Sequence, residues 1–399
     1  MKRKAALKVA AIVLACIAGA CVVLWSVLFV ISGGFMKQTY MEPWSKDYAA
    51  KYPDPRVRLT AGGLLAASGH NMQPWKIVLD KTDPAGFYLY ADSSRMTKEV
   101  DPLARQMMIS QGTFLEYAAV AGEKEGWNAA IELFPDGAYD ESQLAQSMDT
   151  KPVAKITLSK AQAKSSPLYD AIFLPDTNRG AYRADKLSSR QASALESLSN
   201  GSGGSVRVYQ DQPNLDKIGG YAMQSAEIEA GTARVMEESD AVFRANESQK
   251  NQYRYGFSVE GQGTSGLMKP VLQGLLTLFP SLNTGEAASR TFISGTRASV
   301  GSTPAYAMIV TSGNSRSAQV ESGMLYSRLV LTGHTLGLAM QPLSQALEEY
   351  PEMKAPYAGF KEAYAPGGGT VQMLFRIGQP TKSTPLSMRR DVTELIVKK

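Results

Sequence analysis

A long apolar segment near the start of the chain separates two parts that need different surroundings. No charged residue occurs between Lys8 and Lys37, and this run is longer than the roughly 20 residues that a helix needs to cross a bilayer. A secretory signal has a shorter apolar core and a small-residue cleavage site. The run is too long for such a signal and carries Trp25 in its second half. We therefore predict an uncleaved N-terminal membrane anchor over residues 1–36, with a cleaved signal and a lipoprotein modified at Cys21 as weaker alternatives.

Basic residues around this segment predict its orientation. Four cations precede it, namely Lys2, Arg3, Lys4 and Lys8, and only Lys37 follows closely. Cytoplasmic flanks of membrane helices carry an excess of Lys and Arg. The expected protein is thus single-pass, with a cytoplasmic N-terminus and a globular module on the outer side of the membrane.

Composition excludes several classes of function for the globular part. The chain of 399 residues is 44% hydrophobic and 20% charged, which is typical of a folded protein. Its net charge of +5 is not gathered into a basic stripe, so nucleic acid is not an expected partner. Both cysteines, Cys16 and Cys21, lie in the apolar segment, which leaves the module without disulfides, thiolate metal sites or cysteine nucleophiles. With only His70 and His334 in the chain, no metal site is expected.

The module alternates segments that predict helices and strands. Helices are expected at 56–68, 103–125, 166–174, 188–198 and 215–243. Strands are expected at 75–79, 86–90, 129–134, 152–158, 205–209, 305–311, 338–342 and 371–377. Residues 244–266 are polar and predict a surface excursion, and the apolar stretch 267–279 predicts a helix that covers another part of the protein.

A faint internal repeat joins these elements. One copy is the helix expected at Gln106–Glu125, and the other is the helix expected at Val320–Thr335; each is followed by a glycine and a strand. The duplication predicts two fused halves, residues 37–164 and 165–399, that pack within one chain as the subunits of a homodimer do.

The densest polar cluster is the run Ser68–Gly69–His70–Asn71–Met72–Gln73–Pro74–Trp75, between an expected helix and an expected strand. Its Ser hydroxyl and its Asn and Gln amides donate and accept hydrogen bonds without carrying charge. Such a set suits recognition of a planar heterocycle. The alternative is a plain helix end, with Gly69 in a turn and an edge strand that begins at Trp75.

Two further segments carry possible anion-binding groups. Thr177, Asn178 and Arg179 follow an expected helix, and a guanidinium can bind phosphate in a bidentate way. A solvated loop is the alternative. Arg376, at the end of an apolar strand, is the second possible anion-binding group, and a structural salt bridge is the alternative role for it. His334 is expected to be a structural histidine.

Taken in chain order, these segments resemble one family. The run from Ser68 to Trp75 is similar to the Ser-x-His-Asn-x-Gln-Pro-Trp signature of the nitroreductase superfamily, and looks closest to the branch known from mycobacterial Acg-type proteins. The resemblance covers roughly residues 56 to 390. Its other matches, in the same order, are Asp101–Pro102 through Arg105, Ile109–Ser110–Gln111–Gly112, Thr177–Asn178–Arg179 with Tyr182, Ser302–Thr303–Pro304–Ala305, Gly337 to Leu343, and Arg376 to Pro380.

The resemblance implies an α+β flavin-binding fold with FMN held between two halves. In ordinary nitroreductases the halves are two subunits, whereas this branch resembles a fused pair, so a monomer acting as an internal pseudo-dimer is expected. The implied cofactor-binding residues are Ser68, Asn71, Gln73 and Trp75 of the first half, Thr177, Asn178, Arg179 and Arg376 of the second half, and Pro342 and Leu343 beside the ring. No catalytic residue is implied.

The implied activity is FMN-dependent two-electron reduction of nitroaromatic or quinone-like electrophiles, with NAD(P)H as a candidate electron donor. A second hypothesis is an FMN-binding or sequestering protein with little turnover, in which residues 244–266 and the apolar segment after them form a lid. A third is a membrane-tethered domain without cofactor. The sequence departs from the family's pattern at two places: Pro175 and Asp176 stand where family members carry an arginine, and Gln111 stands where they carry a cysteine. Because a carboxylate near a phosphate is unfavourable, Asp176 favours the third hypothesis.

Overall fold

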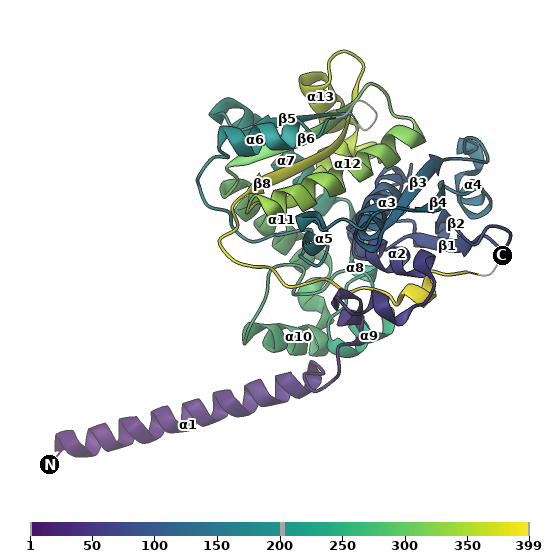
Figure 1. Ribbon diagram of the computed structural model, residues 1–399. Helices are drawn as coiled ribbons and strands as arrows, with labels where there is room; N and C mark the ends of the chain where they lie inside the picture. The colour runs from purple at the N-terminus through teal and green to yellow at the C-terminus, as the bar shows by residue number, and fades with distance from the viewer. Residues whose placement is uncertain (1, 200–203, 398–399) are drawn as a thin grey trace.

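A computed structural model describes residues 2–199 and 204–397 of the chain. Helix α1 (Lys2–Ile31) projects from the globular part as a single rod (Figure 1). Its segment Ala6–Ile31 has a mean hydropathy of 2.7 and is long and apolar enough to cross a membrane. Its last turns contact the module, where Leu28 is buried.

Two four-stranded antiparallel sheets form the framework of the module. Their strand orders are β1-β2-β4-β3 and β5-β6-β8-β7. The strands are β1 (Trp75–Leu79), β2 (Gly86–Ala91), β3 (Trp127–Leu133), β4 (Ala154–Lys160), β5 (Ser205–Tyr209), β6 (Ala305–Thr311), β7 (Ala339–Pro342) and β8 (Thr370–Gly378). Each predicted strand is present, with bounds within about two residues of the prediction.

The two sheets have the same connectivity. In each, a long helix joins the second strand to the third: α3 (Arg105–Glu125) joins β2 to β3, and α12 (Arg316–Thr335) joins β6 to β7. These are the two helices of the predicted repeat. The remaining α-helices are α2 (Pro55–Gly63), α4 (Leu144–Thr150), α5 (Pro167–Ala171), α6 (Ser189–Glu196), α7 (Gln212–Gly231), α8 (Ala233–Ala241), α9 (Glu247–Tyr253), α10 (Met268–Leu278), α11 (Gly285–Gly301) and α13 (Lys354–Tyr364).

Helices α3 and α12 cross at two glycines. A Cβ placed on Gly112 would lie 1.8 Å from the carbonyl oxygen of Val320, and a Cβ on Gly323 would lie 1.9 Å from the carbonyl oxygen of Ile109. Only glycine allows two backbones to approach this closely. The Ser327 hydroxyl donates to the carbonyl oxygen of Thr113 (3.2 Å) along the same contact. The two halves are therefore joined through this helix pair.

The C-terminal segment returns from the second sheet to the first. Figure 1 shows it, in yellow, passing from β8 across the molecule to β1. The Ile77 N–H donates to the carbonyl oxygen of Leu395 (2.7 Å), and the Val397 N–H donates to that of Ile77 (2.9 Å). Val392 and Leu395 are fully buried in the core of the first half. The predicted boundary between residues 164 and 165 stays a prediction, and the tail adds residues of the second segment to the first core.

Two predictions about the segment between β5 and β6 are wrong. The helix expected at 215–243 is two helices, because the chain leaves the helical conformation at Thr232 (φ −99°, ψ 93°). The surface excursion expected at 244–266 contains α9 and buried charges. Lys250 is 1% exposed and pairs with Glu247 at 2.7 Å and Glu260 at 2.5 Å. Paired charges can be buried where single ones cannot, so polar composition did not mean exposure.

Candidate functional site

A cavity of about 400 Å³ lies between the two halves. Its walls come from the loop after α2, the start of α3, the segment before β5, helix α11, the end of β7 and the C-terminal tail. Cofactor and substrate sites in proteins are concave pockets of about 300–1,000 Å³. The cavity is thus large enough for a ligand of cofactor size.

Six of the ten residues predicted to bind a cofactor line this cavity, namely Ser68, Asn71, Thr177, Arg179, Pro342 and Leu343. Asn71 comes from the first half and Arg179 from the second, so the fold brings the two polar segments to one place. The other four, Gln73, Trp75, Asn178 and Arg376, do not line the cavity and are hydrogen-bonded within the protein. The cofactor-binding role of all ten stays a prediction.

The loop that carries Ser68 and Asn71 has an unusual backbone. His70, Asn71 and Gln73 have φ angles of 51°, 50° and 50°. Non-glycine residues enter this left-handed region at a cost and persist there when the surroundings hold them. The Asn71 side chain supplies part of that hold, because its Nδ2 donates to the carbonyl oxygens of Gly256 (3.2 Å) and Met388 (3.1 Å). The loop is therefore shaped by contacts with distant segments.

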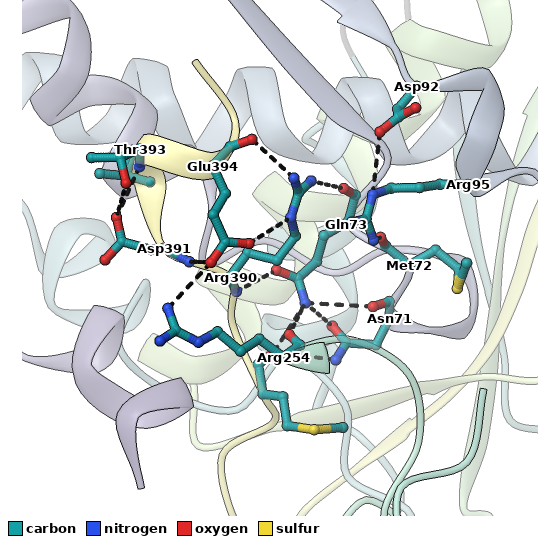
Figure 2. Close-up of polar contacts among 12 residues, drawn as sticks. Asn71, Met72, Gln73, Asp92, Arg95, Arg254, Arg390, Asp391, Thr393 and Glu394 are labelled. Atoms are coloured by element: carbon teal, nitrogen blue, oxygen red, sulfur yellow. Dashed lines mark hydrogen bonds and ion pairs between the residues drawn. The ribbon is translucent and has the colours of Figure 1, made fainter. Parts of the chain in front are cut away.

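Gln73 ties the same loop to two other parts of the chain. Figure 2 shows it between Asn71 and Arg390. Its Nε2 donates to the carbonyl oxygens of Arg254 (2.9 Å) and Met388 (3.2 Å), and its Oε1 accepts from the Arg390 N–H (2.8 Å). Trp75, in turn, is fully buried in the first core. Both residues support the loop from behind and do not face the cavity.

Arg389 lines the cavity and was not predicted. Its Nη1 donates to Asn71 Oδ1 (3.0 Å), and its Nη2 donates to the carbonyl oxygens of Leu65 (2.7 Å) and Ala66 (3.0 Å). Burial lowers the pKa of Arg389, and the nearby Asp176 carboxylate opposes that shift. In sequence, Arg389 is one of two adjacent arginines near the C-terminus, and nothing local distinguishes it from a surface charge.

Arg376 and Asn178 hold the segment that carries Thr177 and Arg179. The Arg376 guanidinium donates to the carbonyl oxygen of Gly180 (2.6 Å) and to Gln341 Oε1 (2.7 Å), and it lies 4.0 Å from the centre of the Tyr182 ring. The Asn178 N–H donates to the carbonyl oxygen of Met340 (2.9 Å). These contacts present the neighbours of Asn178, Thr177 and Arg179, to the cavity.

The charges around the cavity are mixed. Arg179 donates from Nη1 to the carbonyl oxygen of Gly261 (3.0 Å), and burial lowers its pKa while Asp176 opposes that effect. Asp176 itself lines the cavity. On another wall, burial raises the pKa of Glu229 to about 8. Burial and the nearby Glu229 raise the pKa of Glu348 well above its ordinary value.

His70 also faces the cavity, and the fold keeps it neutral. Burial, followed by the charge of Arg179, lowers the pKa of His70 to about 4. Its Nε2 lies 3.1 Å from Ser239 Oγ, and its ring lies 5.0 Å from that of Phe257. His70 therefore adds a neutral hydrogen-bonding group and not a cation at pH 7.

Several lining residues have buried polar atoms that no described residue satisfies with a hydrogen bond. Among these atoms are Tyr326 Oη, Gln372 Oε1 and Arg389 Nε. An unsatisfied buried polar group costs about 1–3 kcal/mol. The cavity therefore suits a ligand that carries both donors and acceptors. The described residues contain no cluster of His, Cys, Asp or Glu that could hold a metal ion.

Comparison with known proteins gives one clear similarity by sequence. Over 87 residues the chain is 31% identical to proteins from two strains of Mycobacterium tuberculosis, each named "Putative NAD(P)H nitroreductase". Over these residues the chain is similar to nitroreductases. The match covers 21% of this chain and 24% of the relatives, so the chain spans about a quarter of their length in the alignment. No protein-family model matches the chain.

Two solved structures align with the chain at TM-scores below 0.5. The nitroreductase-like family protein from Bacillus cereus aligns over 60% of this chain and 99% of its own, with a TM-score of 0.31 and 10% identity. A "putative nitroreductase" from Anabaena variabilis aligns over 84% of this chain and 89% of its own, with a TM-score of 0.39 and 11% identity.

Proposed function

We propose that the protein is an FMN-dependent, nitroreductase-like oxidoreductase that reduces nitroaromatic or quinone-like electrophiles by two electrons. The observation that carries the proposal is a cavity lined by Ser68 and Asn71 from one half and by Thr177 and Arg179 from the other. The similarity to proteins named as NAD(P)H nitroreductases supports it. The polar atoms in the walls that lack hydrogen-bond partners fit a ligand with many donors and acceptors, and FMN is such a ligand.

The equal strand order of the two sheets supports a further part of the proposal. We propose that the chain is a fused pseudo-dimer of the Acg-type branch and acts as a monomer. The α3–α12 pair would then take the place of a subunit interface. Under this proposal the cavity belongs to both halves equally, and neither half binds the flavin alone.

The protein's own residues would do the following work. The chemistry that FMN supplies when bound is two-electron transfer. Arg179 and Arg389 would hold its anionic groups, since guanidinium forms strong charge-assisted hydrogen bonds with phosphate. Asn71 would keep Arg389 in place through the 3.0 Å bond to its Oδ1. Because that amide is committed to the protein, its direct contact with the flavin would be secondary.

Reduction of a nitro group or a quinone also consumes protons. Glu229 and Glu348 line the cavity, and their raised pKa values mean that at least one of the pair keeps its proton at pH 7. A carboxylic acid whose pKa lies near the working pH is suited to general acid catalysis. We assign this pair as the proton reservoir of the cavity.

Orientation in the membrane would decide the electron donor. We propose that α1 is a single-pass anchor with its N-terminus in the cytoplasm and the module outside, because four cations precede the span. NAD(P)H is a cytoplasmic donor, so an outer module would need another source of electrons. A reporter fused to the C-terminus that is active only in the cytoplasm tests this directly, and activity would overturn the orientation.

A second candidate function is FMN binding with little turnover. The segment Gly256–Gln262 favours it, because Arg179 donates to Gly261 and His70 contacts Phe257 across the cavity. This segment could cover a bound flavin. The predicted lid also included α10, yet no residue of α10 lines the cavity.

One experiment tests the proposal and separates the two candidates. We expect the full-length protein, purified in detergent, to show a flavin absorbance band or to acquire one when FMN is added. A colourless protein that takes up no FMN would remove both candidates. Bleaching by NADPH without oxygen supports a reductase, whereas colour that persists with NADPH supports storage.

The Arg179→Ala variant tests the assigned anion site. Loss of one charge-assisted hydrogen bond of about 1.5–3 kcal/mol predicts at least a ten-fold weaker FMN affinity. Arg207→Ala is the matched control, since Arg207 is exposed on β5. FMN titration followed by flavin fluorescence measures both, and equal affinities would show that Arg179 does not hold the cofactor.

A further inference from the structure

Helix α10 packs on the module with its polar face. Lys269, Gln273 and Thr277 recur every four residues and point to buried polar partners. Lys269 Nζ and Gln273 Nε2 lie 2.9 Å and 3.1 Å from Glu247 Oε1, and Thr277 Oγ1 accepts from Asn246 Nδ2 at 3.2 Å. The inner face of this helix is therefore held by ion pairs and hydrogen bonds.

Its other side and the short 3₁₀ helix after it, η6 (Pro280–Asn283), carry exposed apolar side chains. The exposed fractions are 75% for Leu267, 55% for Met268, 49% for Leu278, 54% for Phe279 and 52% for Leu282. A surface helix of a water-soluble protein has the opposite arrangement, with its apolar stripe toward the core. Contiguous exposed apolar surface marks an interaction site.

The packing of α10 on α1 fixes its depth. Trp25 Nε1 donates to the carbonyl oxygen of Leu267 (3.2 Å), and a Cβ on Gly274 would lie 2.8 Å from the carbonyl oxygen of Leu28. Trp25 precedes the end of the apolar span at Ile31 by six residues, or about 9 Å along the helix axis at 1.5 Å per residue. The start of α10 thus lies beside the span itself and not beyond its end.

Aromatic rings gather at the same level. Trp25 stacks on Phe29 with ring centres 5.1 Å apart, and Phe29 meets Phe35 edge-on at 5.0 Å. Phe35 is 83% exposed. Aromatic side chains are enriched where a membrane protein passes the boundary between lipid and water.

We infer that α10 and η6 form a membrane-docking element that lies in the boundary between headgroups and acyl chains of the same bilayer that α1 crosses. The partner is the lipid surface, because apolar side chains and a packed transmembrane helix are adjacent there and amphipathic helices bind this region. The inference rests on the membrane anchor of the proposed function and is independent of the flavin. The element holds the module in a fixed pose on the membrane.

Depth-dependent quenching in vesicles tests the inference with the full-length chain. In a background with Cys16→Ser and Cys21→Ser, a single cysteine is introduced by Leu282→Cys, by Leu103→Cys or by Leu14→Cys and labelled with a fluorophore. Leu103 is the matched control, since it is 53% exposed and lies just before α3, where Arg316 at the start of α12 donates to its carbonyl oxygen. Leu14 is the reference for insertion of α1. The vesicles are phosphatidylcholine with a fraction of nitroxide-labelled phosphatidylcholine.

We expect strong loss of fluorescence at positions 14 and 282 and little loss at 103. Quenching at 282 no stronger than at 103, with 14 quenched, would overturn the docking element and leave the anchor intact. An unquenched label at 14 would overturn both. Because the three labelled side chains are exposed, the variants should fold; an unchanged far-ultraviolet circular dichroism spectrum confirms that for each.

Discussion

At the scale of single residues, Asp176 decides how well the cavity can hold an anion. Its carboxylate lines the cavity and acts electrostatically on Arg179 and Arg389. A unit charge a few ångströms away in a partly buried site is worth about 1–3 kcal/mol. We therefore expect Asp176→Asn to raise the affinity for FMN about ten-fold, measured by the same fluorescence titration. Asp176→Glu is the control with its charge kept. A weaker affinity in Asp176→Asn would show instead that the carboxylate positions the arginines.

The buried acid Glu229 gives the protein a pH-dependent stability. Burial raises the pKa of Glu229 in the folded protein to about 8, whereas its pKa in the unfolded chain is near 4.5. Folding therefore takes up a proton at any pH between these two values. The stabilising effect is complete below pH 4.5 and is lost as pH rises through 8. We expect Glu229→Gln to lose less stability than the wild type between pH 5 and pH 8, measured by urea denaturation. Glu362→Gln, at an exposed site on α13, serves as control. An equal change in all three proteins would contradict the role of Glu229.

Which site residues could be predicted follows from the range of their contacts. The run Ser68 to Trp75 was found because its polar groups are adjacent in sequence. Which of them face the cavity could not be found, because Gln73 and Trp75 are turned by partners elsewhere. Arg389 was missed for the same reason, since its partners Asn71 and Leu65 are more than 300 residues away in the chain. Local sequence contains no record of such contacts.

At the scale of elements, the crossing of α3 and α12 is a sharp structural constraint. Gly112→Ala would place a methyl group against the backbone of Val320, which no side-chain rotation can relieve. Overpacking of this kind costs about 1–3 kcal/mol or more. We expect a fall of that size in the free energy of unfolding. Gly220→Ala in α7 is the matched control, because nothing lies within 4 Å of its Cβ, and helix propensity alone should make it slightly stabilising. Similar stability in Gly112→Ala and the wild type would mean that the helices do not cross there.

The elements that the sequence predicted are those with a strong local signal. The strands carry β-branched and aromatic runs bounded by turns, and α3 has a regular apolar period. Helices α11 and α13 were not predicted. The sequence of α11 contains Gly285, Gly295 and Gly301 and several serines, residues of low helix propensity, so its helix depends on packing against α7 and α8. For α10 the helix was predicted correctly, but the direction of its apolar face was not.

At the scale of the whole molecule, the division into two halves is less complete than the repeat suggests. The predicted second half supplies Val392 and Leu395 to the core of the first. It also supplies Arg389 and Arg390, which fix the loop of Asn71 and Gln73. A tail that crosses between two sheets has no periodic signature, so the sequence could not indicate it. Its consequence is that the stability of each half depends on the other.

This dependence predicts one unfolding transition for both halves. Phe360 on α13 is fully buried beside the second sheet, and Phe360→Ala should cost about 3–5 kcal/mol. Three of the four tryptophans, Trp44, Trp75 and Trp127, lie in or against the first core, so tryptophan fluorescence reports mainly on the first half. We expect Phe360→Ala to shift the denaturation midpoints of fluorescence and of far-ultraviolet circular dichroism by the same amount in detergent solution. Leu395→Ala, in the first core, is the reciprocal variant and should shift both signals together as well. If Phe360→Ala moved only the circular dichroism transition and left the fluorescence midpoint unchanged, the two halves would fold independently despite the crossing tail.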